Sequence, residues 1–177
     1  MGSILKSTLS NTKLIVFLSV SFLFILLFLI PFVRVPGRAR MERNFQRHNE
    51  SIIMIKNYIT EQGHDNILVW DRHAEAGVLS LGLGYDPIPV SDEDVLGAIR
   101  LLFERRRVNV IVRRGNNIIF QMWSTRNHGR GIVYSIDGSV PAPSSGLQYL
   151  TEIEPLSEEA WFFYVENVHT WRSRNRN

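Results

Sequence analysis

The segment "VNVIVRRGNNIIFQMW", residues 108–123, decides the fold, because it predicts a β-hairpin. Two apolar runs flank Gly115 and Asn116, and both of these residues tolerate the positive φ that two-residue hairpin turns require. In that register three pairs of apolar residues lie opposite each other: Val112–Ile119, Ile111–Phe120 and Val108–Trp123. Apolar side chains then fall on both faces, so we expect a sheet with something packed on each side.

Working outward, three more segments predict strands: "NILVW" at 66–70, "GIVYSI" at 131–136 and "AWFFYVEN" at 160–167. The segment 91–106, "SDEDVLGAIRLLFERR", predicts a helix with Ser91 as N-cap, acids in its first turn and arginines in its last. Residues 71–90 gather Gly and Pro and predict a partly irregular connection. The fold class is therefore α+β: an N-terminal transmembrane helix, then a small domain with a mostly antiparallel sheet and two packing helices.

A further helix is predicted over residues 38–62, with Gly63 as its stop. Six positions recur at alternating steps of four and three and form one stripe, apolar except for His48: Met41, Phe45, His48, Ile52, Ile55 and Ile59. The stripe favours packing against the domain's own sheet. The alternative is a juxtamembrane coiled-coil stalk, which would make the protein a homodimer.

The chain also contains a long uncharged stretch, "LIVFLSVSFLFILLFLIPFV", from Leu14 to Val33. A helix needs about 20 apolar residues to cross a bilayer, because each residue adds about 1.5 Å across a hydrocarbon layer of about 30 Å. A cleaved signal peptide is the main competitor, but its apolar region spans only about 7–15 residues and ends in a small-x-small site. Here "PFVRVPGRAR" follows instead, so we expect an uncleaved single-pass anchor in the lipid bilayer.

Two arguments about sidedness conflict. Lysine and arginine tend to remain in the cytoplasm, and five arginines follow the stretch, whereas only Lys6 and Lys13 precede it. Against that, an N-terminal anchor after a short basic tail usually exports the rest of the chain. We expect a membrane protein whose C-terminal domain is exported rather than cytoplasmic.

These features divide the chain into five parts: a basic tail at 1–13, the transmembrane helix at 14–33, a juxtamembrane basic amphipathic helix at 34–62, the α+β domain at 63–170 and a basic polar tail at 171–177. The net charge of +3 argues against a nucleic-acid partner, which a strongly basic domain would indicate. The chain has no cysteine, which excludes disulfides and lipid attachment at a cysteine.

One candidate metal site follows the first predicted strand. Asp71, His73 and Glu75 alternate, so they would face one side if that strand continued through them, and carboxylates with an imidazole hold divalent metals. In a helix the same spacing would scatter them. His128, in the polar loop "STRNHGRG", is a further residue that a loop between strands could display for binding or catalysis.

Two surfaces are candidates for binding. An aromatic patch for a protein partner of unknown identity would use Trp123, Trp161 and Phe163, but sheet core covered by the two helices is the favoured interpretation of these aromatics. A basic segment beside the membrane would touch anionic lipid if it faced the cytoplasm: Arg34, Arg38, Arg40, Arg43 and Arg47.

We therefore expect a single-pass membrane-anchored protein with a small α+β interaction or sensor domain, acting by binding rather than catalysis and without a cofactor. The first alternative is an anchored metal-dependent enzyme that uses Asp71, His73 and Glu75, with His128 as a further participant. The second is a cytoplasmic-facing domain that binds anionic lipid.

Overall fold

The computed structural model describes residues 18–21, 35–81, 86–104, 107–143, 147–157 and 159–167. The chain forms two compact units, Met1–Val35 and Pro36–Asn177. Most of the predicted transmembrane stretch, 14–33, lies outside the described residues, as do the tails at 1–13 and 171–177; residues 18–21 are helical. Among the described residues, no helix is both long and apolar enough to cross a bilayer.

The second unit is built on one antiparallel sheet. In the described part of the chain its strands are β1 (Asn66–Val69), β2 (Val78–Leu81), β3 (Asp86–Pro89), β4 (Val110–Arg114), β5 (Asn117–Thr125), β6 (His128–Ser135), β7 (Leu150–Pro155) and β8 (Trp161–Asn167). Their order across the sheet is β3-β2-β1-β4-β5-β6-β8-β7. The predicted α+β class with a mostly antiparallel sheet is confirmed.

The predicted hairpin is β4–β5, with two of its three predicted pairs, Val112–Ile119 and Ile111–Phe120, in register. The ladder ends at Val110 and Gln121, so the third predicted pair, Val108–Trp123, is not part of it. In the turn, Gly115 alone has positive φ, at 54°. Asn116 does not need the left-handed region, so the turn depends on glycine at its first central position.

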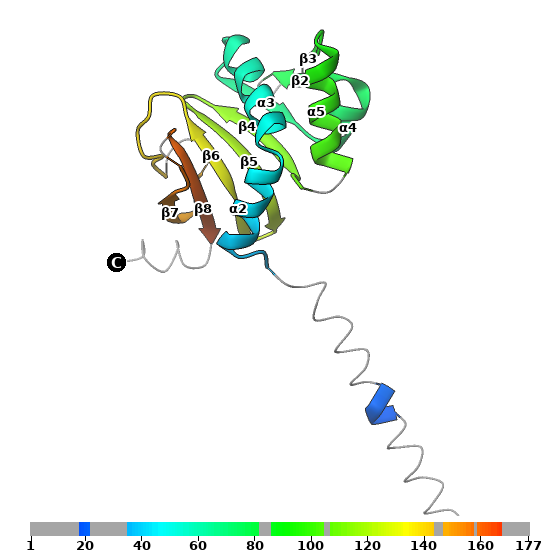
Figure 1. Ribbon diagram of the computed structural model, residues 1–177, viewed down its shortest axis with the longest axis vertical. Coiled ribbons are helices and arrows are strands. Elements are labelled where there is room, and N and C mark those ends of the chain that lie inside the picture. The colour runs from blue at the N-terminus through cyan, green and yellow to red at the C-terminus, as the bar shows by residue number, and fades with distance from the viewer. Residues whose placement is uncertain are drawn as a thin grey trace, which may run out of the picture. The chain divides into compact units, whose positions relative to one another are not determined.

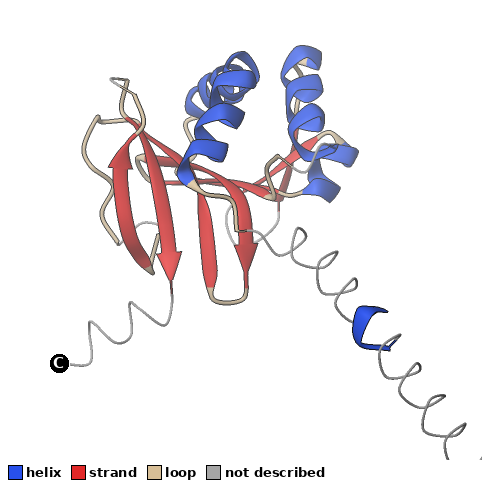
Figure 2. Cartoon of the chain, turned by 60° about the horizontal axis from the view of Figure 1, so that its bottom comes forward, coloured by secondary structure: helices blue, strands red, loops and turns tan. Residues whose placement is uncertain are grey.

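Four helices are described in this unit: α2 (Arg38–Arg47), α3 (Asn49–Glu61), α4 (Asp71–Ala76) and α5 (Glu93–Glu104). Figures 1 and 2 show α2, α3 and α5 on the same face of the sheet. The predicted helix over 38–62 is thus two helices that meet at His48. Every residue of its predicted stripe is buried: Met41, Phe45, His48, Ile52, Ile55 and Ile59.

The sheet carries a core on each face. The larger one joins the stripe of α2 and α3 to α5 and to inward residues of the strands, including Phe120 and Trp161. The smaller one lies on the opposite face and gathers Ile119, Val133, Leu147, Phe162 and Tyr164. Because the stripe is buried inside its own unit, it is not available for the stalk that was its alternative interpretation.

Three local expectations were wrong. Residues 71–90 are more regular than expected, since they contain α4, β2 and the edge strand β3, which tolerates two prolines because an edge strand leaves some N–H groups unpaired. The N-cap of α5 is Asp92, not Ser91: Asp92 Oδ1 accepts the N–H groups of Asp94 and Val95 at 2.9 and 3.1 Å. Strand β7 was not expected, because its sequence "LTEIEP" is mostly polar.

Candidate functional site

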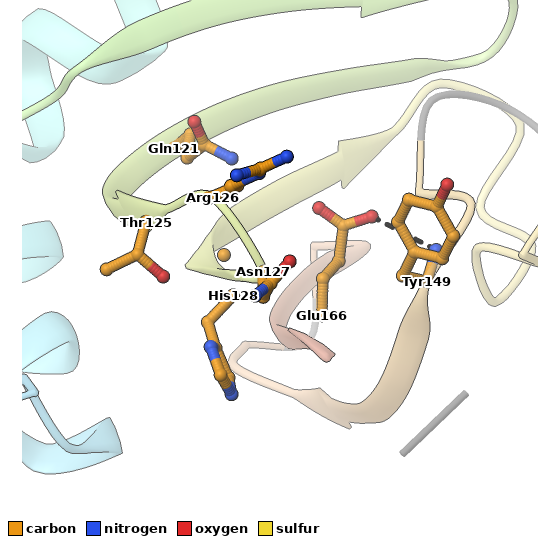
Figure 3. A pocket seen from close by; sticks show the side chains of 8 residues that line it. Gln121, Thr125, Arg126, Asn127, His128, Tyr149 and Glu166 are labelled. Atoms are coloured by element: carbon orange, nitrogen blue, oxygen red, sulfur yellow. Dashed lines mark hydrogen bonds between the residues drawn. The ribbon is translucent and has the colours of Figure 1, made fainter. Parts of the chain in front are cut away.

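A polar pocket lies at the end of the sheet where the β5–β6 turn meets the end of β8 (Figure 3). Its volume is about 110 Å³. It is lined by Gln121, Thr125, Arg126, Asn127, His128, Gly129, Tyr149 and Glu166. We call it the sheet-end pocket.

Cross-strand pairing places the three central residues of this pocket side by side. Gly129 of β6 pairs with Glu166 of β8. Gln121 of β5 pairs with Gly131, which lies two residues after Gly129 and on the same face of β6. A methyl group built on Gly129 would lie 3.0 Å from Gln121 Nε2 and 3.1 Å from Glu166 Oε2. The two polar side chains therefore lean over the glycine from opposite sides, and the missing Cβ is what leaves room between them.

Glu166 is the acidic group of the pocket. Its Oε1 accepts the backbone N–H of Tyr149 at 3.3 Å, shown as the dashed line in Figure 3. Burial raises the pKa of the Glu166 carboxyl, while the Tyr149 N–H and the charge of Arg114 act in the opposite direction. The carboxylate is thus partly removed from water with one oxygen still directed over Gly129, an arrangement suited to a ligand that donates hydrogen bonds.

Tyr164 lies on the same face of β8, two residues before Glu166, and is fully buried. Burial, with a smaller effect from the Glu166 charge, raises the pKa of the Tyr164 hydroxyl, and the Gln121 side chain lowers it. The hydroxyl is therefore a neutral, buried group beneath the pocket.

Arg126 is the basic group of the pocket and stands in the β5–β6 turn, where its side chain is exposed. Within the described part of the chain, its guanidinium makes no ion pair with Glu166 or any other carboxylate. The pocket thus carries one basic and one acidic side chain that do not neutralise each other by direct contact.

His128, one of the residues that the sequence analysis considered, contributes to the wall of this pocket. Its ring is turned away from the Glu166 carboxylate (Figure 3) and lies near the Trp123 ring, with 6.5 Å between ring centroids. His128 is therefore placed at the pocket without being directed at its acid.

The proposed metal ligands lie elsewhere, in α4. Strand β1 ends at Val69, and Asp71, His73 and Glu75 belong to a short helix, so the strand on which that hypothesis depended does not continue through them. No group of three His, Asp or Glu side chains in the described residues is close enough to hold a metal ion. His73 Nδ1 instead accepts the N–H of Trp70 at 3.2 Å, and the pKa of His73 is lowered by burial and then by the Arg72 charge.

The basic residues of the juxtamembrane segment divide into two groups, apart from Arg34, which lies outside the described residues. Arg38 forms an ion pair with Glu154 and donates to the carbonyl oxygen of Pro155 at 3.2 Å. The other three, Arg40, Arg43 and Arg47, are exposed on α2. Arg38 thus links the start of α2 to β7, whereas Arg40, Arg43 and Arg47 can meet solvent or a charged surface.

Two of the three proposed partner-binding aromatics are core residues. Trp161 is 1% exposed and Phe163 is 4% exposed, so neither can meet a partner in this fold. Trp161 packs on Phe45 of α2 with 5.1 Å between ring centroids. Trp123 is partly buried. The aromatic patch was therefore wrong for Trp161 and Phe163, because their strand positions face the helices.

Sequence reasoning missed Gln121, Gly129 and Glu166. Glu166 carried a signal, since it is the first charge after five consecutive apolar residues in β8. Gly129 and Gly131 alternate in β6, which also indicated that one face of that strand lacks side chains. What could not be predicted was that β8, rather than β7, pairs with β6 and brings Glu166 to Gly129.

No protein-family model, curated protein or solved structure matches this chain.

Proposed function

We propose that this protein is a single-pass membrane protein that holds a small α+β binding domain next to the bilayer and acts by recognition rather than catalysis. The observation that carries the proposal is the short distance along the chain between two features. The uncharged stretch ends at Val33, and the compact unit begins at Pro36. Three residues reach at most about 10 Å, so a domain tethered in this way stays at the membrane surface.

The start of the domain is firmly attached to the sheet, which supports a short tether. Arg130 Nη1 donates to the Pro36 carbonyl oxygen at 3.2 Å. Arg38, at the first turn of α2, pairs with Glu154 of β7. These two contacts fix the first residues of the domain on the sheet.

The sheet-end pocket supports the binding role. It combines an amide, a carboxylate and a guanidinium around Gly129, and convergent polar groups in a concavity are the feature by which small-molecule sites fix the orientation of a ligand. We place the domain on the exported side, where it would act as a sensor or accessory subunit with a protein partner.

The exposed arginines of α2 favour a second candidate, the cytoplasmic-facing domain that binds anionic lipid. Arg40, Arg43 and Arg47 lie at steps of three and four and share one face of α2, opposite its buried side. Each arginine near an anionic surface contributes about 1 kcal/mol to attraction. The orientation of the chain in the membrane separates the two candidates.

Membrane fractionation of the full chain tests the proposal. We expect the wild-type protein, at its full unprocessed mass, to remain in the pellet after alkaline carbonate washing and to dissolve only in detergent. A double variant, Leu23→Arg with Leu26→Arg, should leave the membrane, because each arginine at the centre of a span costs about 2.5–3.5 kcal/mol on insertion scales. The matched double alanine variant at the same positions should stay in the pellet.

Unprocessed wild-type protein in the aqueous supernatant would overturn the proposal. A shorter, soluble product with a new N-terminus after residue 33 would show a cleaved signal peptide instead, which also overturns it.

A further inference from the structure

We propose that the sheet-end pocket binds a small zwitterion, a molecule of amino-acid size with one ammonium and one carboxylate group. Glu166 would receive the ammonium group and Arg126 the carboxylate group. This inference rests on the proposed binding role and adds to it the chemical class of the ligand.

The acidic half of the site is already oriented. The Tyr149 N–H holds Glu166 Oε1 at 3.3 Å, which leaves Oε2 directed over Gly129. An ammonium group has three N–H donors and no acceptor, so it matches the Glu166 carboxylate oxygen, whereas Gln121 Nε2 is itself a donor and matches the carboxylate group of the ligand. Hydrogen bonds between charged groups are shorter and about twice as strong as those between neutral groups.

The basic half supplies the opposite charge. The Arg126 guanidinium lines the same pocket and forms no ion pair with a described residue. Its planar group matches a carboxylate in a two-bond arrangement. A ligand with only one charge would leave the other charged side chain unused, whereas a zwitterion pairs with both.

The size of the pocket limits the ligand. Sites for drug-sized molecules have volumes of about 300–1,000 Å³. The volume of about 110 Å³ lies below that range and above what one water molecule needs. A ligand with few heavy atoms and two charged ends meets both limits.

Gly129 provides the most selective test of the site. An alanine there would place a methyl group between Gln121 Nε2 and Glu166 Oε2, at 3.0 and 3.1 Å, and both contacts are with the ends of flexible side chains. The fold can therefore accept Gly129→Ala while the ligand space is lost. Gly97→Ala is the matched control, because a methyl group on Gly97 has nothing within 4 Å.

The experiment is saturation-transfer NMR on the full chain in detergent micelles, with glycine and L-alanine as probes and with acetate and methylammonium as single-charge controls. Wild type and Gly97→Ala should bind both amino acids and bind each single-charge control at least about tenfold more weakly, which corresponds to 1.4 kcal/mol. Gly129→Ala and Glu166→Gln should each bind the two amino acids at least about tenfold more weakly than wild type does. Arg126→Gln should bind glycine no better than methylammonium.

Thermal unfolding of each variant shows whether a loss of binding is caused by a loss of folding. A variant that does not fold is replaced by Gln121→Ala, which is expected to weaken the binding of both amino acids. The inference is overturned if wild type binds neither amino acid, if Gly129→Ala binds them unchanged, or if acetate and methylammonium bind as well as the amino acids do. These failures are distinguishable from failure of the proposed function, because membrane fractionation does not depend on the pocket.

Discussion

The ring of Tyr164 lies against Gly131, so closely that a methyl group on Gly131 would stand 3.0 Å from Tyr164 Cε1. The same methyl group would be 2.1 Å from the backbone oxygen of Phe120, which cannot move without distorting β5. Gly131 therefore lets β5, β6 and β8 approach each other beneath the sheet-end pocket.

Gly131→Ala should lower the free energy of unfolding by about 1–3 kcal/mol, the usual cost of overpacking a core. Gly97→Ala, in α5, should raise it by about 0.5–1 kcal/mol, because alanine favours the helix and meets open space. Chemical denaturation in detergent measures both. Equal effects of the two substitutions would contradict the close contact at Gly131.

Arg113→Met should lower the free energy of unfolding by about 1–3 kcal/mol, because it leaves buried carbonyl groups without a donor. Arg113 is 8% exposed, and its Nη1 donates to the carbonyl oxygens of Ile59 and Thr60 at 2.9 and 3.2 Å. It thus ties the end of α3 to β4. Arg43→Met, an exposed arginine of α2, should change stability by no more than about 0.5 kcal/mol. A loss at Arg43 as large as that at Arg113 would refute this role.

Asp137→Ala should destabilise the protein at pH 7 and have less effect in acid. The hydroxyl and N–H of Ser139, then Ser135 Oγ and Asn116 Nδ2, donate to the Asp137 carboxylate and hold its pKa far below the ordinary value. A lowered carboxyl pKa stabilises the folded state above the ordinary pKa of about 3.9, and this contribution is lost as pH falls through the folded value.

Denaturation of wild type and Asp137→Ala between pH 2 and pH 8 should therefore show a difference that is constant above about pH 5 and shrinks below about pH 4. Ser139→Ala should show part of the same pattern, because it removes one of the donors. A difference that is independent of pH would contradict the role of the charge.

Glu166→Gln should have the opposite pH dependence. Burial raises the pKa of Glu166 above its ordinary value, so the folded state holds a proton that the unfolded chain has already lost. Wild-type stability then falls as pH rises from about 4.3 through the higher folded value, whereas the variant avoids this loss. Denaturation at pH 8 should find Glu166→Gln at least as stable as wild type, with the advantage gone below about pH 4. A less stable variant at pH 8 would mean that the Tyr149 N–H and the charge of Arg114 outweigh burial.

Local patterns were sufficient to predict the parts of the fold whose partners are near in sequence. The β4–β5 hairpin follows from Gly115 and its flanking apolar runs, and the buried stripe of α2 and α3 follows from helical periodicity. The break at His48 was missed, since the stripe runs through it without interruption.

Strand β7 and the sheet-end pocket could not be predicted in the same way, because they depend on pairings between distant segments. Strand β7 pairs with β8 through a mostly exposed sequence, so its apolar pattern is weak. The pocket requires Gln121, Gly129 and Glu166 to meet across three strands, and no spacing along the chain encodes that order. For the aromatic run of β8, the sheet-core interpretation is confirmed and the partner patch at Trp161 and Phe163 is not.

The most direct test of the membrane account uses the absence of cysteine from the chain, which makes single-cysteine labelling unambiguous. Ser3→Cys and Ser173→Cys are expressed separately and treated with a membrane-impermeant maleimide, first in intact cells with an accessible outer surface and then after lysis. The account predicts that Ser173→Cys is labelled in intact cells and Ser3→Cys only after lysis. The reverse pattern would support the lipid-binding candidate, and equal labelling of both positions in intact cells would contradict a chain that crosses the membrane.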